Sequence, residues 1–364
     1  MKAAFVCFRP YQVFNAINMV YHNIEQTKGR SDLYVQDLPA LKAMVPHLAS
    51  LGVFENVYVF SELNHGDKAN VGRKQQTKIY LVRTKNFIFA HSALKKNCYT
   101  KPEGGFRQYD LILASGWISF FIELANCNPK ARVVLFEDGT ANYVYDQIAS
   151  LAPIRKKYYG FLKKVFNKGP LCMTVSALYV NNPGMMIGTR PYPVYPLGEY
   201  DDGLLDLLAR AYNYDKTEEI YKNKEVVFLG QPQTTLNVPT YSETELVRNL
   251  SVMTDMVYRK HPLQKDLETF ACEDTVRPMW ELACRNIDEN CALVAQFSTA
   301  QITPYMVYGK CPTLVFFYKI SCKPSSRRNT YKQLIDMVRQ NYTGKIYEPE
   351  TMEELYEIIR DLKK

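Results

Sequence analysis

The 364-residue chain has no apolar run approaching about 18 residues, so no transmembrane helix is expected. Arg9-Pro10 interrupts the first apolar residues too soon for a signal peptide, and residues 3–8 instead predict a first strand. Nine cysteines occur without a C-x-x-C pair, which argues against a disulfide framework and against a zinc site. Reduced thiols and a cytoplasmic location are the expectation.

The charge and the missing motifs limit the partners. A net charge of +8 suits an anionic substrate or an anionic membrane surface. No basic and aromatic nucleic-acid motif accompanies it, so nucleic acid is not an expected partner. No Asp-x-Asp motif stands at a strand end, so the sequence implies no metal and no other cofactor.

Strand and helix patterns alternate along the chain. We expect strands in the first half at 3–8, 32–36, 57–60, 78–81, 109–114 and 133–136. In the second half they fall at 225–229, 256–258, 292–295 and 313–317. The alternation predicts an α/β fold with parallel sheets. A charged stretch at about 212–224 predicts a boundary between two Rossmann-like domains, 1–215 and 216–364.

Two predicted helices have apolar faces whose packing partners the sequence leaves open. Residues 154–168 form a basic amphipathic helix with an aromatic face, which suits a membrane interface; a surface helix packed on its own domain is the alternative. Thr351 opens a last helix with an apolar face that includes Leu355 and Ile359. We expect that helix to pack back on the body of the protein, with the N-terminal domain as one option.

Two carboxylates, Glu137 and Asp138, stand at the carboxyl end of the strand 133–136. Open α/β folds place their ligands at such strand ends. Adjacent residues point opposite ways, so one acid can face a cleft as a base while the other hydrogen-bonds the loop. A turn with two solvated acids is the alternative.

Polar residues also follow the first strand. Gln12 and Asn15, together with Tyr11, lie where a strand enters a helix, and such turns face ligands in βαβ units. We therefore expect these three residues on the acceptor side of a binding site. The alternative is that they cap or solvate the first helical turn.

Three features in this order, Glu137-Asp138-Gly139, His261-Pro262 and Ser298-Thr299, resemble the bacterial sialyltransferases. The closest resemblance is to glycosyltransferase family 52, the lipooligosaccharide and capsule sialyltransferases. Supporting stretches are 9–16, 136–140, 229–232 and 297–300, which span almost the whole chain. The two Rossmann-like halves likewise resemble the GT-B architecture, in which two such domains face each other across a cleft.

The resemblance implies metal-independent, inverting transfer of sialic acid from CMP-sialic acid to a hydroxyl of a cell-surface glycan. It implies Glu137 or Asp138 as the general base, with Glu137 favoured because it lies nearer the strand, and His261 as a donor to the leaving phosphate. Ser298 and Thr299 would hold that phosphate at a helix N-terminus, and Glu281 the ribose. The remaining donor-side residues it implies are Gly139, Gly230, Gln231 and Pro262.

Other readings stay open from the residues alone. The same architecture would serve another donor, such as CMP-Kdo or a UDP-sugar. A non-catalytic protein that binds sugar nucleotides or assists membrane assembly is a second class. The reduced thiols favour the cytoplasm, and the basic helix 154–168 leaves open peripheral contact with the inner face of an anionic membrane. The sequence leaves a homodimer open and names neither acceptor nor linkage.

Overall fold

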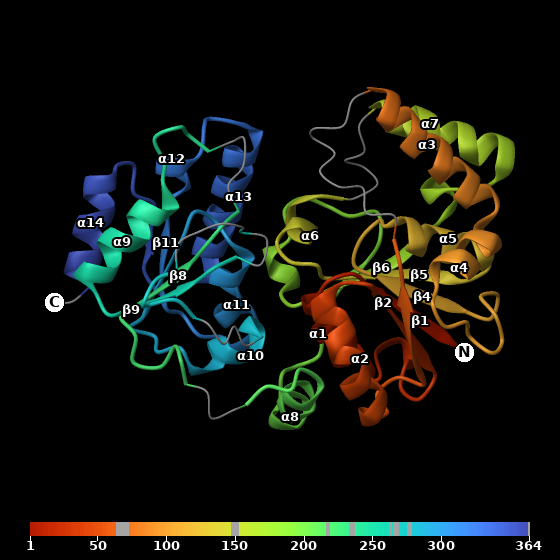
Figure 1. The fold of residues 1–364 in the computed structure, drawn as a ribbon, viewed down its shortest axis with the longest axis horizontal. Helices are drawn as coiled ribbons and strands as arrows, with labels where there is room; N and C mark the ends of the chain where they lie inside the picture. The colour runs from red at the N-terminus through yellow and green to blue at the C-terminus, as the bar shows by residue number, and fades with distance from the viewer. Residues whose placement is uncertain are drawn as a thin grey trace. The chain divides into compact units, whose positions relative to one another are not determined.

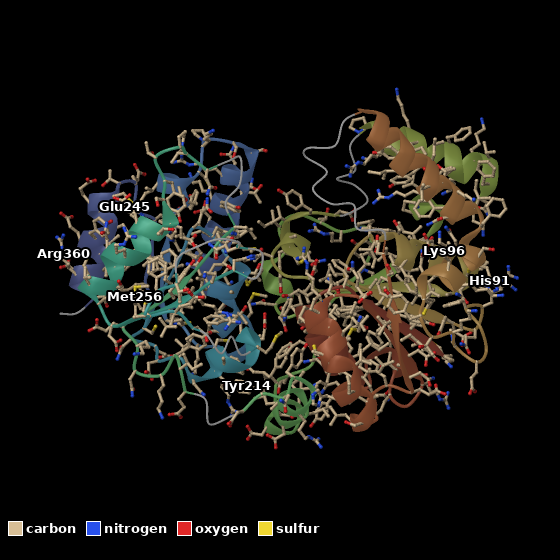
Figure 2. The ribbon with its side chains drawn as sticks, viewed as in Figure 1. His91, Lys96, Tyr214, Glu245, Met256 and Arg360 are labelled. Carbon is tan, nitrogen blue, oxygen red and sulfur yellow. The ribbon has the colours of Figure 1, made fainter. Side chains whose placement is uncertain are left out.

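A computed structural model describes residues 1–62, 73–146, 153–215, 219–232, 237–261, 264, 269–274 and 279–362. The chain forms two compact units, Met1–Asn213 and Tyr214–Lys364. Figure 1 shows a sheet with its own helices in each unit, and Figure 2 labels Tyr214, the first residue of the second. Each unit is therefore a separate α/β domain with its own core.

The first unit contains a seven-stranded sheet in the order β3-β2-β1-β4-β5-β6-β7, with every neighbouring pair parallel. Its strands are β1 Ala3–Cys7, β2 Ser31–Gln36, β3 Asn56–Phe60, β4 Leu111–Ala114, β5 Arg132–Phe136, β6 Val175–Val180 and β7 Val194–Pro196. The central strands β1 and β4 are buried along their whole length, as expected where helices cover both faces of a parallel sheet.

Among the described residues of this unit, eight α-helices connect or flank these strands. They are α1 Pro10–Tyr21, α2 Pro39–Leu51, α3 Arg73–Ile88, α4 Ala90–Asn97, α5 Ser119–Cys127, α6 Ala141–Val144, α7 Pro153–Phe166 and α8 Asp202–Ala211. Pro10 opens α1, where its missing N–H leaves no helical bond unmade. In Figure 1, α3 and α7 lie beside each other, away from the sheet. Short 3-10 turns stand at Ile24–Gln26, Pro170–Cys172 and Pro183–Met185.

The second unit contains a five-stranded sheet in the order β12-β11-β10-β8-β9, again entirely parallel. Its strands are β8 Val226–Leu229, β9 Met256–Arg259, β10 Ala292–Ala295, β11 Thr313–Phe316 and β12 Ile346–Tyr347. Its helices are α9 Glu243–Met253, α10 Trp280–Ala283, α11 Thr299–Tyr308, α12 Tyr318–Ser321, α13 Ser326–Asn341 and α14 Met352–Asp361, with a 3-10 turn at Cys284–Asn286.

The last helix, α14, packs inside the second unit. Leu355 and Ile359 are buried in one cluster with Leu246 and Leu250 of α9, and Asn249 Nδ2 donates to Tyr356 Oη at 2.9 Å. Figure 2 shows the two helices together, with Glu245 labelled on α9 and Arg360 on α14. Within the second unit, α14 therefore packs against α9.

The strands predicted for the first unit need two corrections. Residues 78–81 lie within α3 rather than in a strand, because the surrounding stretch has no glycine or proline to end a helix. Strands β6 and β7 were not among the predicted strands. The predicted α/β class with parallel sheets is correct.

Candidate functional site

The acid pair leaves the first sheet at the carboxyl end of β5. Strand β5 ends at Phe136, and Glu137 and Asp138 follow directly. Gly139 then takes a φ of 105°, a left-handed conformation that glycine adopts without strain. The turn at Gly139 therefore allows the chain to enter α6 while both acids stay at the edge of the sheet.

Glu137 is completely buried and serves as a hydrogen-bond acceptor inside the unit. Its carboxylate accepts from Tyr11 Oη at 2.5 Å, from Tyr143 Oη at 2.5 Å and from the backbone N–H of Asn181 at 2.7 Å. Burial raises the pKa of Glu137, and these hydrogen bonds oppose that rise. Glu137 thus ties α1, α6 and the end of β6 together at one point.

Asn15 and Tyr200 complete the network around Glu137. Asn15 Nδ2 donates to the backbone carbonyl of Glu137 at 3.0 Å, and Tyr200 Oη donates to Asn15 Oδ1 and to Asn181 Oδ1 at 3.2 and 2.9 Å. Asn181 Nδ2 donates back to Tyr11 Oη at 3.0 Å. The network therefore occupies the polar atoms of Asn15 and Tyr11, which the sequence placed on the acceptor side.

Asp138 differs from its neighbour because its side chain is 18% exposed. Gln12 Nε2 donates to Asp138 Oδ1 at 2.7 Å, and Arg9 Nη1 lies 3.8 Å from Oδ2. Burial raises the pKa of Asp138, while Arg9 and Gln12 lower it. Of the two acids, only Asp138 reaches solvent, and it is already held in place. It can therefore accept a proton from a bound hydroxyl.

The second sheet brings three predicted motifs to one edge. Strand β8 lies between β9 and β10, so the chain runs to one side of β8 first and to the other side later. Such a switch point is where open α/β sheets bind ligands. Gly230-Gln231, His261 and Ser298-Thr299 follow the carboxyl ends of β8, β9 and β10 respectively. Pro262 lies outside the described residues.

Glu243, in the first turn of α9, accepts hydrogen bonds that hold this edge of the sheet together. It was not among the residues predicted from the sequence. It is 2% exposed and accepts from Tyr258 Oη at 2.8 Å, from Gln264 Nε2 at 2.5 Å and from the backbone N–H of Gln231 at 3.1 Å. Burial raises its pKa against the effect of these bonds. The only signal in the sequence was its place next to the helix cap Ser242.

Glu243 also explains why a glycine follows β8. A Cβ at position 230 would lie 2.6 Å from Gln264 Oε1, 2.8 Å from Glu243 Oε1 and 3.1 Å from Tyr258 Cε2. Side chains of the protein itself therefore occupy the space beside Gly230. The Gly230 turn is therefore tightly packed before any ligand binds.

Gln264 fixes the loop that carries His261. Its Oε1 accepts from the backbone N–H of His261 at 2.5 Å, while its Nε2 donates to the carbonyl of Gln231 at 2.9 Å. Beside it, Lys260 pairs with Glu273 at 3.2 Å. Gln264 thereby links the end of β8 to the end of β9, which holds the backbone of His261 beside Gln231.

Ser298 begins helix α11 as a capping box. Its Oγ accepts from the N–H of Ala300 at 3.2 Å, and Gln301 Oε1 accepts from the N–H of Ser298 at 3.1 Å. Gln301 also donates to the carbonyls of Leu293 and Val315 at 3.0 Å each. The start of α11 is thereby fixed against β10 and β11, with its positive end at the ligand edge.

Glu281 lies on the short helix α10, which two interactions hold in place. Trp280 Nε1 donates to the carbonyl of Ala300 at 2.8 Å, and the Arg259 guanidinium lies 5.6 Å from the Trp280 ring centroid. Arg259 itself pairs with the buried Asp274 at 3.0 Å. Burial raises the pKa of Glu281 to about 7, with Arg259 opposing the rise. Its carboxylate can therefore accept or donate a hydrogen bond near neutral pH.

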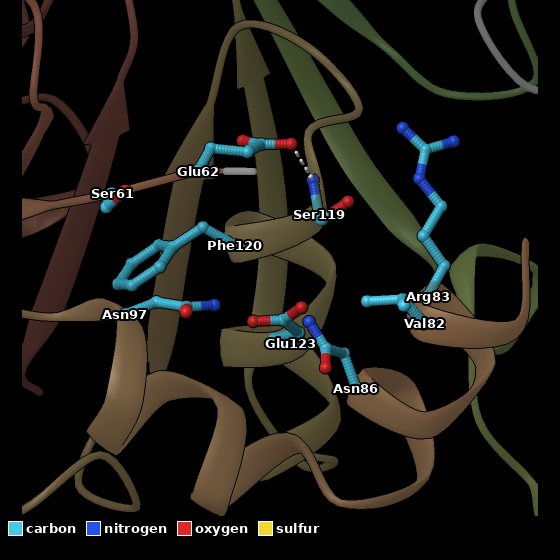
Figure 3. A pocket seen from close by; sticks show the side chains of 9 residues that line it. All are labelled: Ser61, Glu62, Val82, Arg83, Asn86, Asn97, Ser119, Phe120 and Glu123. Atoms are coloured by element: carbon cyan, nitrogen blue, oxygen red, sulfur yellow. Dashed lines mark hydrogen bonds between the residues drawn. The ribbon is translucent and has the colours of Figure 1, made fainter. Parts of the chain in front are cut away.

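A separate polar cavity lies in the first unit (Figure 3). It encloses about 10 Å³, room for about one water molecule. Glu62 accepts from the N–H of Ser119 at 2.8 Å. Glu123 is completely buried with neither oxygen in hydrogen-bond geometry, and burial raises its pKa to about 8. The volume excludes a sugar or a nucleotide from this cavity.

In the described part of the chain, no cluster of three or more His, Cys, Asp or Glu side chains is arranged to hold a metal ion. All nine cysteines are free thiols, as the sequence predicted. None of the described helices is both long and apolar enough to cross a bilayer.

Comparisons with known proteins give structural matches only. No protein-family model matches the chain, and no curated protein is significantly similar to it. A putative UDP-N-acetylglucosamine 2-epimerase from Listeria monocytogenes matches 100% of this chain and 88% of its own, at 11% identity and a TM-score of 0.52. The glycotransferase of kitacinnamycin matches 99% of this chain and 90% of its own, at 8% identity and a TM-score of 0.50.

A sialyltransferase from Photobacterium damsela matches 93% of this chain and 78% of its own, at 10% identity and a TM-score of 0.43. That score is too low to bear on the donor. The chain has the fold of the GT-B glycosyltransferases: two α/β units, each built on a parallel sheet. At these identities the matches define the fold and leave donor and acceptor undetermined.

Proposed function

We propose that the protein is an inverting sialyltransferase that moves sialic acid from CMP-sialic acid to a hydroxyl of a cell-surface glycan, in a capsule or lipooligosaccharide. One observation carries the proposal: the motif residues 230–231, 261 and 298–299 converge at the switch point of the second sheet. The GT-B fold supports transfer between a nucleotide sugar and an acceptor, and the resemblance in the motifs supports the choice of donor.

Asp138 is the residue that we assign as general base. An acceptor hydroxyl is a weak nucleophile, and a carboxylate within hydrogen-bond reach must take its proton. The acceptor oxygen then bonds to the anomeric carbon of sialic acid, and the bond from that carbon to the CMP phosphate breaks with its electron pair going to the phosphate. The full enclosure of Glu137 favours Asp138 for this step, although the sequence favoured Glu137.

The donor side is assigned to the second unit. His261 would donate a hydrogen bond or proton to the departing phosphate, and Ser298 and Thr299 with the α11 N-terminus would bind its oxygens. Glu281 suits a ribose diol because its raised pKa lets it donate as well as accept. Gly230 and Gln231 would lie beside the nucleotide, and Pro262 keeps its predicted role next to His261.

The residues around α1 take a supporting role in this proposal. Gln12 is completely buried, and it bridges the N–H of Phe8 to Asp138 at 2.6 and 2.7 Å. Tyr11 and Asn15 hold Glu137, so all three position the acid loop instead of binding the acceptor directly. Gly139 gives that loop its left-handed turn.

A donor panel tests the proposal. The protein is incubated with CMP-sialic acid, CMP-Kdo and UDP-sugars, each with galactoside and sialoside acceptors, with and without EDTA, and nucleotide release is measured. Acceptor-dependent CMP release from CMP-sialic acid alone, unchanged by EDTA, is the expected result. Release from another donor would replace sialic acid in the proposal. Tight CMP binding without turnover on any acceptor would indicate a non-catalytic binding protein.

A further inference from the structure

Helix α7 uses only a narrow part of its apolar surface for packing. Tyr159 and Leu162 are buried, and Tyr158 contacts α3 through Thr84 Oγ1 and the carbonyl of Tyr80. The rings of Tyr80 and Tyr158 also meet, with centroids 5.2 Å apart. These contacts fix α7 against α3, as the side-by-side helices in Figure 1 show.

The rest of the apolar surface of α7 faces solvent. Phe161 is 57% exposed, Val165 53% and Phe166 40%, and the rings of Phe161 and Phe166 touch edge to face at 6.3 Å. Phe161 and Val165 are four residues apart and so share one side of the helix. The alternative of a helix packed on its own domain accounts for Tyr159 and Leu162 but leaves this aromatic patch unused.

Exposed apolar side chains concentrate on this helix pair. Leu81 of α3 is 65% exposed, and Phe89, which follows α3, is 59% exposed. With the three residues of α7 they make up five of the ten exposed large apolar side chains among the described residues. Single exposed apolar residues need no explanation, but their concentration on two helices that pack together marks an interaction surface.

The two chain segments that carry the patch contain basic residues but no acidic ones. The sequence contains no Asp or Glu from residue 73 to residue 101, nor from 147 to 198. Helix α7 carries five basic residues, and all five are exposed: Arg155, Lys156, Lys157, Lys163 and Lys164. Lys168 differs, because its Nζ donates to the carbonyl of Asn126 and pins the end of α7 to α5. Two acid-free segments that combine exposed lysines with exposed phenylalanines complement an anionic lipid bilayer.

We propose that the α3–α7 face, defined by Leu81, Phe89, Phe161, Val165, Phe166 and the five basic residues of α7, docks the protein on the surface of an anionic membrane. The phenylalanines insert at the boundary between head groups and acyl chains, and the lysines contact the anionic head groups. This goes beyond the transfer reaction: it places the first unit at a membrane whichever donor the protein uses.

Vesicle co-sedimentation of the whole chain tests the proposal. Binding to phosphatidylcholine vesicles that contain phosphatidylglycerol is compared with binding to phosphatidylcholine alone. We expect binding to the anionic vesicles only, weakened at least about tenfold by Phe161→Ser with Phe166→Ser, and by a similar factor by Lys163→Glu with Lys164→Glu. Equal binding to both vesicle types, or to neither, would overturn the proposal.

Matched controls separate docking from general effects. Val252→Ser removes a side chain that is 84% exposed on α9 in the second unit, and Lys323→Glu with Lys332→Glu repeats the charge change there. Both controls should bind like wild type, and thermal unfolding should show every variant folded, because each altered residue is exposed. If Phe161→Ser with Phe166→Ser keeps vesicle binding but dissolves a dimer seen by ultracentrifugation, the face is an interface between copies and the membrane proposal is wrong.

Discussion

Two buried glutamates, one in each unit, play corresponding parts at the edges of their sheets. Glu137 gathers two tyrosine hydroxyls and a backbone N–H in the first unit, and Glu243 gathers tyrosine hydroxyls, an amide and a backbone N–H in the second. Beside each lies a more exposed residue suited to chemistry, Asp138 and His261 respectively. The comparison teaches that a buried glutamate at the edge of a parallel sheet can hold several chain segments together through its hydrogen bonds.

A third buried glutamate, Glu123, differs from both Glu137 and Glu243. Glu123 is as buried as Glu137, yet its carboxylate completes no hydrogen bond. Burial accordingly raises its pKa to about 8. Burial raises the pKa of all three glutamates, and hydrogen bonds from tyrosine hydroxyls and a backbone N–H oppose that rise at Glu137 and Glu243.

The largest expected effect concerns His261, the exposed member of the second unit's pair. In the proposed mechanism, replacing it with alanine removes the donor to the departing phosphate, so turnover should fall by about 10²–10⁴. Affinity for the nucleotide sugar, measured by calorimetry, should fall less, because Ser298 and Thr299 still bind the phosphate. Wild-type turnover in His261→Ala would remove His261 from the mechanism.

Alanine in place of either organising glutamate should lower stability by a comparable amount. Glu137→Ala and Glu243→Ala each leave several buried donors without an acceptor, so the free energy of unfolding should fall by about 2–5 kcal/mol. Urea unfolding measures this. The control Glu245→Ala, on the exposed side of α9, should change it by less than about 1 kcal/mol. If Glu243→Ala matched that control, the correspondence between the two glutamates would fail.

Gly230→Ala probes the packing that Glu243 imposes. The added methyl group would lie against Gln264 and Glu243, so we expect a loss of about 1–3 kcal/mol in stability and weaker nucleotide binding. Gly160→Ala is the matched control, because a Cβ there meets nothing within 4 Å and the residue lies within α7. That control should be neutral or slightly stabilising. Equal results for the two glycines would show that the Gly230 turn is loose.

Glu123 predicts how stability depends on pH. Its pKa rises from 4.5 to about 8 on folding, so the folded state holds a proton that the unfolded chain releases. The contribution is fully present below pH 4.5 and is lost as pH rises through about 8, about 5 kcal/mol in total. Glu123→Gln should flatten the pH dependence of the unfolding free energy between pH 4.5 and about 8. An unchanged slope in the variant would contradict the assignment.

The sequence predicts the local parts of this structure well. Ser298 and Thr351 begin their helices as expected, and the strands that end at the acid pair, His261 and Ser298 are correctly placed. Local hydrogen bonds and hydrophobic periodicity determine such features, and both can be read within a few residues.

The contacts that assign roles are not local, and the sequence did not reveal them. Asn181 and Tyr200 reach Glu137 and Asn15 from far along the chain, and no motif marks either residue. Gln12 and Asn15 likewise could be assigned to substrate only because nothing local shows that they are buried. Residues 78–81 were predicted as a strand because their side chains are β-prone, but they lie within a longer helix.

The most direct test compares turnover in Asp138→Asn and Glu137→Gln, by nucleotide release at saturating donor and acceptor, with folding checked by thermal unfolding. We predict that Asp138→Asn loses about 10²–10⁴ in kcat while remaining folded, because the base is gone. Glu137→Gln should unfold at a lower temperature yet stay within about tenfold of wild-type kcat, since its role is to hold the loop. Wild-type kcat in Asp138→Asn together with a larger loss in Glu137→Gln would contradict the division of roles between the two acids.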